Sequence, residues 1–484
     1  MKIPFVTKPW WVTDEYATNE ASTGMYDCML EAKPGGGWLL TKRPGFKELC
    51  NPGTNTPGQG CHYSEKLDAL FFVSDGKLWK YTSAGITVTL VGTGIHATNT
   101  VIFAEGQNLD SSAIIYIADG TKLKYTNGTT LTEVTDVTAP TDATSVAWFS
   151  NRFIANSDGS NFFYATGINP GTLLFDNTYW SGAFNPFAAE VKGDDITAIH
   201  SFSGELWVSG EEGIEIWQDD GVTPLITLQS SFIETGAIAP KSITRIDLSV
   251  YALVKLQGEL MVCRYDGRTP VPISQSISRP LNELVEVRDA IGFHIFTGGA
   301  SFFVLTFPTE RVTWVWDIKN EYWAKWGVWD SNAGDYNIYE GQYSAYASKW
   351  GKYLVQSNVD GKIYEVSREF LSDANNLIRG FYLSPSFDHG TLKRKRCKEF
   401  RLYVKRLPGN NTGDKNISLK WNSDGRSEWS NELTSSVANT DQYNSFLDFK
   451  RMGIYKSRRY ALTMADYANY LIGDAEMEVE VLRD

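Results

Sequence analysis

A sequence pattern typical of a β-hairpin recurs along the chain, and it is the feature that most restricts the fold. A short apolar run, 70–73 (LFFV), leads through Asp75-Gly76 into a second run, 77–81 (KLWKY). Because Asp-Gly tolerates the positive φ of a tight turn, this pattern predicts two antiparallel strands joined by that turn. Turn glycines with similar flanks stand at positions 76, 120, 159, 204 and 258, which are 44, 39, 45 and 54 residues apart. A period of about 40–50 residues with about four strands per repeat is typical of propeller blades.

The composition agrees with a fold built from such strands. The 484 residues include 16 Trp, 24 Tyr and 25 Phe, which favour strands, and 42 Gly, which supply turns. A chain of this length can bury about three quarters of its unfolded surface. We therefore predict an all-β fold whose body, between about residues 45 and 372, is a β-propeller with six or seven blades. A series of β-sandwiches is the alternative for this region.

After the body, the expected strands are longer and alternate strictly between apolar and polar residues. The run 476–480 (EMEVE) is one example, and 400–406 is another. Such alternation indicates a sheet with one face in the core and one face in water. We expect an irregular N-terminal arm over residues 1–45, the propeller-like body over 46–376, and a C-terminal antiparallel β-sandwich over 377–484.

Charge is unevenly distributed along the chain. The C-terminal block carries 18 Lys and Arg against 14 Asp and Glu, a net charge of +4. Because the whole chain has a net charge of −12, residues 1–376 carry −16. An acidic body repels nucleic acid, which argues against sequence-specific DNA binding there. Repulsion is compatible with DNA that slides past the protein.

The most concentrated positive charge lies in the C-terminal block. Its six members are Lys393, Arg394, Lys395, Arg396, Lys398 and Arg401. One interpretation is a solvated edge strand whose charges prevent pairing with other chains. The other is an electrostatic contact with DNA phosphate or with the acidic body of another subunit. These six residues are the candidate site for a partner or for DNA.

Motifs of known enzymes are absent from the sequence. It contains no GxSxG, HExxH, P-loop or strand-linked GxGxxG motif, and its five His are dispersed without metal-ligand spacing. A glycosidase works with two carboxylates. The adjacent acidic pairs are Asp194-Asp195, Glu211-Glu212 and Asp219-Asp220. Strand neighbours face opposite sides, so solvated turn acids are the simpler interpretation. We predict no catalytic residue, no cofactor and no metal.

Neither a membrane segment nor a secretion signal is expected. The longest apolar stretch, 291–307, is interrupted by His294 and two glycines, and it is shorter than a spanning helix requires. The first residues lack the apolar region of a signal peptide. The five Cys are odd in number and lack CxxC spacing, which favours reduced structural thiols over a redox or zinc role.

Several passages, in their order along the chain, together resemble one known family. These passages are 39–45 (LLTKRPG), 213–217 (GIEIW), 232–239 (FIETGAIA), 361–365 (GKIYE), 450–453 (KRMG), 458–462 (RRYAL) and 476–480 (EMEVE). They are similar to the tail hub proteins of short-tailed bacteriophages, which are also called nozzle, tail accessory or packaged-DNA stabilisation proteins. The segment 165–189 departs from the family pattern, so the blade number stays open.

The resemblance implies a structural, non-enzymatic protein of the virion, located in the short tail and assembled in the host cytoplasm. It implies a homohexameric ring below the portal and its adaptor ring, which retains packaged DNA and lets it pass during genome ejection. The implied partners are other copies of the chain, the adaptor, tail fibres or tailspikes, and a plug or needle protein. Two rival functions remain: a propeller glycosidase or depolymerase that acts on host surface glycan, and a cellular propeller scaffold.

Overall fold

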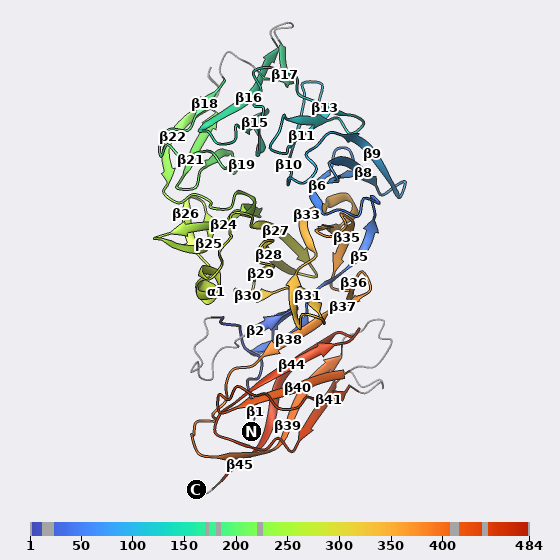
Figure 1. The fold of residues 1–484 in the computed structure, drawn as a ribbon, viewed down its shortest axis with the longest axis vertical. Coiled ribbons are helices and arrows are strands. Elements are labelled where there is room, and N and C mark those ends of the chain that lie inside the picture. The colour runs from blue at the N-terminus through green and yellow to red at the C-terminus, as the bar shows by residue number, and fades with distance from the viewer. Residues whose placement is uncertain are drawn as a thin grey trace.

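The structure, a computed structural model, describes residues 2–11, 24–169, 174–180, 185–219, 226–406, 416–437 and 444–482. In these residues nearly all regular structure is β-strand. Three single turns of 3-10 helix and one short helix, α1 (Ser278–Asn282), are the helical elements there. No helix in the described part of the chain has the length and apolar character needed to cross a membrane. The predicted all-β propeller class is confirmed (Figure 1).

Six blades are each built from four consecutive antiparallel strands. The first two contain β6 (Gly58–Ser64), β7 (Ala69–Ser74), β8 (Lys77–Thr82) and β9 (Thr87–Thr93), then β10 (Ile102–Gln107), β11 (Ala113–Ala118), β12 (Lys124–Thr126) and β13 (Leu131–Glu133). The third and fourth contain β14 (Val146–Phe149), β15 (Arg152–Asn156), β16 (Phe162–Asn169) and β17 (Leu174–Trp180), with β18 (Phe187–Ala188) beside β16, then β19 (Ala198–Phe202), β20 (Glu205–Ser209), β21 (Ile214–Asp219) and β22 (Ile226–Ile233). The fifth and sixth contain β23 (Thr244–Ile246), β24 (Ser249–Leu256), β25 (Glu259–Asp266) and β26 (Thr269–Pro272), then β27 (Ile291–Thr297), β28 (Ala300–Phe307), β29 (Val312–Asp317) and β30 (Tyr322–Lys325).

The first Asp-Gly turn forms as the sequence predicts. β7 and β8 pair with Ser74 opposite Lys77, and the two residues between them, Asp75 and Gly76, have φ values of 58° and 64°. Two consecutive positive φ values are typical of a type I′ turn, whose twist suits the two strands that it joins.

A closing sheet combines both ends of the propeller sequence. Its strands are β33 (Gly341–Ala347), β34 (Lys352–Ser357), β35 (Ile363–Ser367) and, from the N-terminal side, β5 (Gly45–Cys50). β5 pairs antiparallel with β35, with Phe46 opposite Val366. Two short strands, β36 (Ser372–Asp373) and β37 (Asn376–Leu377), continue the sheet beyond β5. The ring therefore cannot open at this sheet without breaking a strand ladder.

The blades bury their faces against one another, and β7 shows this most clearly. All six of its residues are buried. Leu70 packs with Leu354 of the closing sheet, whereas the next residue, Phe71, packs with Ile115 of β11 in the second blade. Successive residues of a strand point to opposite faces, so a strand between two blades must be apolar throughout. This explains the unbroken apolar run in the sequence.

In the described part of the segment predicted as an irregular arm, residues 1–45, four short strands precede β5. These are β1 (Lys2–Ile3), β2 (Gly24–Tyr26), β3 (Cys28–Ala32) and β4 (Trp38–Lys42). β1 and β4 both pair with β45 (Tyr470–Val481), at the other end of the chain. β3 and β4 also form a local hairpin with each other, whereas β1 and β2 are very short and pair only with strands distant in sequence, so no local pattern identifies them. The three predicted domain boundaries stay predictions.

Two sheets that share one core form what we call the C-terminal unit. The remaining strands are β38 (Arg379–Leu383), β39 (Lys395–Arg406), β40 (Asn416–Ser423), β41 (Leu433–Ser436), β42 (Asn444–Lys450), β43 (Ile454–Tyr455) and β44 (Arg458–Ala465). One sheet has the order β3-β4-β45-β39-β42, and the other includes β2-β38-β44-β40-β41. Phe400 of β39 and Tyr460 of β44 stack across the two sheets, with ring centres 4.7 Å apart.

Strand β2 joins the propeller to the C-terminal unit. Tyr26 lies opposite Lys325 of β30 in a parallel pair and opposite Phe381 of β38 in an antiparallel pair. The sixth blade and one sheet of the C-terminal unit are thus parts of a single nine-stranded sheet. Figure 1 shows the ring of blades above and the C-terminal unit below, with β2 at the joint.

A small two-stranded sheet lies next to this joint. Its strands are β31 (Gly327–Asp330) and β32 (Asp335–Ile338), which pair antiparallel with each other. The backbone N–H of Gly327 donates to Asp27 Oδ1 at 2.8 Å. The small sheet is therefore tied directly to the N-terminal segment.

Candidate functional site

The six predicted contact residues do not form one uniform surface. Lys393 and Arg394 precede β39, and the other four lie within it. Lys395 is buried, and its Nζ donates to the carbonyl oxygens of Thr391 and Lys393, the latter at 2.9 Å. The ammonium also lies 5.9 Å from the ring centre of Tyr455, and burial lowers the pKa of Lys395. Its contacts are with its own chain, and they fix the start of β39.

Lys398 and Arg401 face outward but are already paired. Lys398 Nζ lies 3.6 Å from Glu478 and 3.4 Å from Glu480, both on β45. Arg401 Nε donates to Asp448 at 2.8 Å. These groups are about 40–60% exposed, so each pair contributes about 0–1 kcal/mol to stability. Their positive charge is balanced by carboxylates of the same sheet.

The other three predicted residues keep exposed charges that have no ion-pair partner among the described residues; they are Lys393, Arg394 and Arg396. Strand pairing places the exposed Ile454 of β43 opposite Arg396, whereas the exposed Val481 of β45 lies opposite the buried Lys395. Leu392 is 74% exposed, Ile454 47% and Val481 51%. We call the set Leu392, Lys393, Arg394, Arg396, Ile454 and Val481 the basic tip. Sequence reasoning found its charges but missed its apolar members.

A buried ion cluster ties the N-terminal segment to the closing sheet. Arg43 Nε donates to Asp27 at 2.6 Å, and its two terminal nitrogens donate to both oxygens of Asp373 at 2.9 and 2.5 Å. The guanidinium also donates to the carbonyl of Gly327 at 3.1 Å and lies 4.9 Å from the ring centre of Tyr339. Burial raises the pKa of Asp27 to about 6, although Arg43 opposes this shift. In the sequence, Arg43 stood out only as a member of the passage 39–45.

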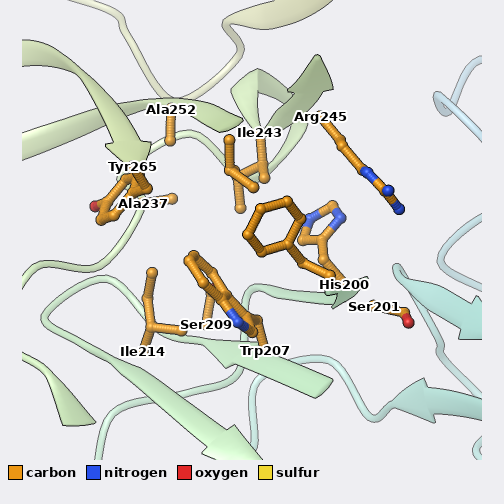
Figure 2. Close-up of a pocket in the computed structure, with 12 residues that line it drawn as sticks. His200, Ser201, Trp207, Ser209, Ile214, Ala237, Ile243, Arg245, Ala252 and Tyr265 are labelled. Atoms are coloured by element: carbon orange, nitrogen blue, oxygen red, sulfur yellow. The ribbon is translucent and has the colours of Figure 1, made fainter. Parts of the chain in front are cut away.

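A small cavity of about 50 Å³ lies between the fourth and fifth blades (Figure 2). Trp207 and Tyr265 line it, together with His200 and Arg245. The Nε2 atom of His200 is buried and has no hydrogen-bond partner among the described residues. Burial lowers the pKa of His200 to about 4, so its ring is neutral at pH 7. No Asp or Glu lines this cavity, so it does not offer the paired carboxylates of a glycosidase.

The adjacent acids weighed for catalysis contact their own chain. Asp194 accepts a hydrogen bond from the backbone N–H of Glu212 at 2.8 Å, and Glu211 accepts from Arg288 at 3.0 Å. Asp220 lies outside the described residues. Within the described ranges, no group of three or more His, Cys, Asp and Glu is arranged to hold a metal ion. The five Cys are free thiols.

Comparison with known proteins identifies a family for most of the chain. The family model described as "Bacteriophage P22 Gp10, beta-propeller" matches residues 15–370. The matched region includes all six blades and the closing sheet. A search among curated proteins finds no match.

Three solved structures to which this chain is similar are distant from it in sequence. The N-terminal domain of Nup159 is 13% identical, with a TM-score of 0.41 over 72% of this chain and 99% of that one. An auxiliary nutrient binding protein from Bacteroides thetaiotaomicron is 9% identical, with a TM-score of 0.37 over 65% of this chain and 69% of that one. The extracellular domain of the one-component system BT4673 from B. thetaiotaomicron is 10% identical, with a TM-score of 0.42 over 90% of this chain and 63% of that one.

Proposed function

The chain belongs to the family of bacteriophage P22 Gp10, a phage stabilisation family with a β-propeller, and from this premise we propose that it is a ring-forming, non-enzymatic subunit of the short tail. The family match over residues 15–370 is the observation that carries the proposal. The structural, stabilising role in a phage tail follows from the family itself. The ring, its hexameric number and its place below the portal adaptor are our proposal.

We propose further that the ring retains packaged DNA and offers docking surfaces for tail fibres or tailspikes and for a plug or needle. A net charge of −16 over residues 1–376 suits a conduit that DNA must leave, because like charge prevents tight binding of the phosphates. No observation favours the alternative of a glycan-degrading enzyme.

In this proposal the basic tip contacts an acidic neighbour, and we commit to the body of a second copy. Three cations that have no ion-pair partner in the described part of the chain, together with three exposed apolar side chains, suit a protein surface that carries negative charge. Electrostatic complementarity between the tip and that body would set the orientation of the subunits and would weaken with salt. Large subunit interfaces, of about 1,200 Å² or more, would supply most of the affinity.

Purified virus particles test the proposal. Quantitative mass spectrometry should find about six copies of this chain per portal ring, following the expectation of a closed cyclic ring. Particles should then be made with a Lys393→Gln, Arg394→Gln and Arg396→Gln triple variant, which should assemble rings less completely and retain less DNA. The matched control is the Lys398→Gln and Arg401→Gln double variant, whose charges are already paired and which should assemble normally.

Two results would count against the proposal at different levels. Absence of the chain from particles would remove the tail role as a whole. Normal assembly and DNA retention in the triple variant would leave the tail role intact but exclude the basic tip as the contact.

A further inference from the structure

A row of side chains on one face of the joint encloses a lysine in aromatic rings. Lys325 lies directly opposite Trp314 of β29 in an antiparallel pair and opposite Tyr26 of β2 in a parallel pair. Residues directly opposite each other in a sheet share a face, so the pairing itself puts a ring on each side of the ammonium. The Nζ of Lys325 lies 4.5 Å from the ring centre of Trp314 and 5.6 Å from that of Tyr26.

A third ring completes this cage from outside the sheet. Trp11 lies 5.2 Å from Lys325 Nζ and packs edge-to-face on Trp314, with ring centres 5.0 Å apart. Its position is fixed by two hydrogen bonds, from its Nε1 to the carbonyl of Trp323 at 2.9 Å and from its backbone N–H to Ser276 at 2.8 Å. The cage is therefore held in place by backbone contacts before any ligand arrives.

Lys325 is half-buried, and it differs from the fully buried lysines because no protein oxygen among the described residues pairs with its ammonium. Lys42 lies 2.9 Å from Asp466, and Lys124 lies 3.1 Å from Asp119. Among the described residues, Lys325 has no hydrogen-bonding or ion-pair partner, only the three rings. A half-buried ammonium without a protein acceptor loses part of its hydration, and aromatic faces recover only part of that cost. Burial accordingly lowers the pKa of Lys325, although the nearby Asp335 opposes this shift.

The cage opens into a cavity of about 280 Å³ beside the propeller joint. The cavity is also lined by Arg311, whose Nε donates to Asn337 at 3.3 Å. Two carboxylates line the cavity, but both accept hydrogen bonds from backbone N–H groups: Glu310 from Val285 and Glu286, and Asp335 from Tyr336. The carboxylates of Glu310 and Asp335 thus accept hydrogen bonds from the backbone. Lys325, with which they could have paired, has no hydrogen-bonding partner among the described residues.

We propose that this cavity, which we call the Lys325 socket, binds a single carboxylate group that accepts a hydrogen bond from Lys325 Nζ. The aromatic rings position the ammonium, and Arg311 offers further N–H donors toward the entering oxygen atoms. The acidic wall formed by Glu310 and Asp335 repels a polyanion such as DNA but tolerates one compact negative group. The volume suits an acidic side chain of a partner protein or a small free carboxylate. The proposal does not depend on ring formation or on the tail role.

Thermal unfolding of the full-length chain tests the socket. Sodium acetate should raise the melting temperature by about 1–3 °C above sodium chloride of equal ionic strength, because a ligand that binds the folded state stabilises it. The Lys325→Met variant should lose this acetate-specific rise while it folds normally. Lys241→Met is the matched control, since Lys241 is also a half-buried lysine with a pKa lowered by burial but lies outside the socket; it should keep the rise.

A second variant and a second probe sharpen the result. Asp335→Asn removes the carboxylate that competes for Lys325 and should tighten acetate binding about two- to fivefold. A short peptide with one Asp and an amidated end should bind more tightly than its Asn counterpart if a partner's side chain is the ligand. If the Asp and Asn peptides bind equally and acetate still raises the melting temperature, the ligand of the socket is a small free carboxylate. Equal effects of acetate and chloride on the wild type, or an acetate effect that survives in Lys325→Met, would overturn the proposal.

Discussion

The propeller and the C-terminal unit use opposite ways to build a sheet. In each of the six blades, the four main strands pair in the order in which they follow one another in the sequence. In the C-terminal unit, the central strand β45 pairs with β1, β4 and β39, and β2 lies between β30 and β38. A blade can therefore form from local hairpins, whereas the C-terminal unit requires both ends of the chain.

The two regions also differ in which strand faces are buried and in where their charged side chains lie. The middle strand of a blade, such as β7, is buried on both faces, whereas β45 alternates between buried and exposed residues. The outer face of the sheet that contains β39 and β45 carries paired charges. For example, Lys398 lies near both Glu478 and Glu480. The propeller is therefore specified mainly by apolar packing, and the C-terminal unit by packing on one face and charge on the other.

The largest expected effect comes from separating the C-terminal unit from the N-terminal strands. A fragment of residues 377–484 should not fold alone, because it lacks β1 and β4 beside β45 and β2 beside β38. Its edge strands and part of its core would be exposed to water. Amide chemical shifts in an NMR spectrum should be poorly dispersed, and gel filtration should show an expanded or aggregated chain.

The same fragment co-expressed with residues 1–44 provides the control. These residues contain β1 to β4, so the complex should regain dispersed amide shifts. A well-dispersed spectrum from 377–484 alone would mean that this unit is independent, and the contrast drawn between the two regions would fail.

A smaller but still large effect should follow from Arg43→Met. The variant leaves two buried carboxylates, Asp27 and Asp373, without their cation, which costs about 3–5 kcal/mol of unfolding free energy. Because the carboxylates can then take up protons, the loss should be smaller at pH 5 than at pH 8. Urea denaturation at both pH values measures this, and calorimetry shows whether the propeller and the C-terminal unit now unfold separately.

Two further variants test the reason for that loss. Arg368→Met breaks a partly exposed pair with Glu31 and should cost about 1 kcal/mol or less. Combining Arg43→Met with Asp27→Asn and Asp373→Asn removes the stranded charges and should recover part of the stability. If the triple variant is as unstable as Arg43→Met, the cost comes from lost packing and not from uncompensated charge.

The sequence predicts the local features of this protein better than its long-range ones. The Asp75-Gly76 hairpin follows from two adjacent residues that accept positive φ, and it forms as expected. The pairing of β5 with β35 closes the ring, yet nothing local in either strand identifies its partner. The candidate site shows the same limit, because a bulge between Cys397 and Glu399 shifts which side chains of β39 face outward. Charge alone could not show that Lys395 points inward.

The smallest of the three effects uses histidines, one in each region. Burial lowers the pKa of His200 in the propeller and of His389 in the C-terminal unit, each to about 4. The unfolded chain, with an ordinary histidine pKa near 6.5, then binds more protons than the folded chain between pH 4 and 6.5. Stability therefore falls as the pH falls through that window, by up to about 2 kcal/mol per fully buried histidine at pH 5. His200→Phe should remove its share of this loss, as urea denaturation at pH 7 and pH 5 would measure.

His389 makes the comparison between the regions decisive. Its Nε2 lies 2.8 Å from the Tyr455 hydroxyl, whereas His200 Nε2 has no partner among the described residues. His389→Phe should therefore cost about 1 kcal/mol at pH 7 through the lost hydrogen bond, while His200→Phe should be nearly neutral there. At pH 5 both variants should lose less stability than the wild type does. If the pH dependence of the unfolding free energy is unchanged in His200→Phe, the propeller accommodates a charged imidazole. The hydrogen-bond partner of His389 would then not be what distinguishes the two regions.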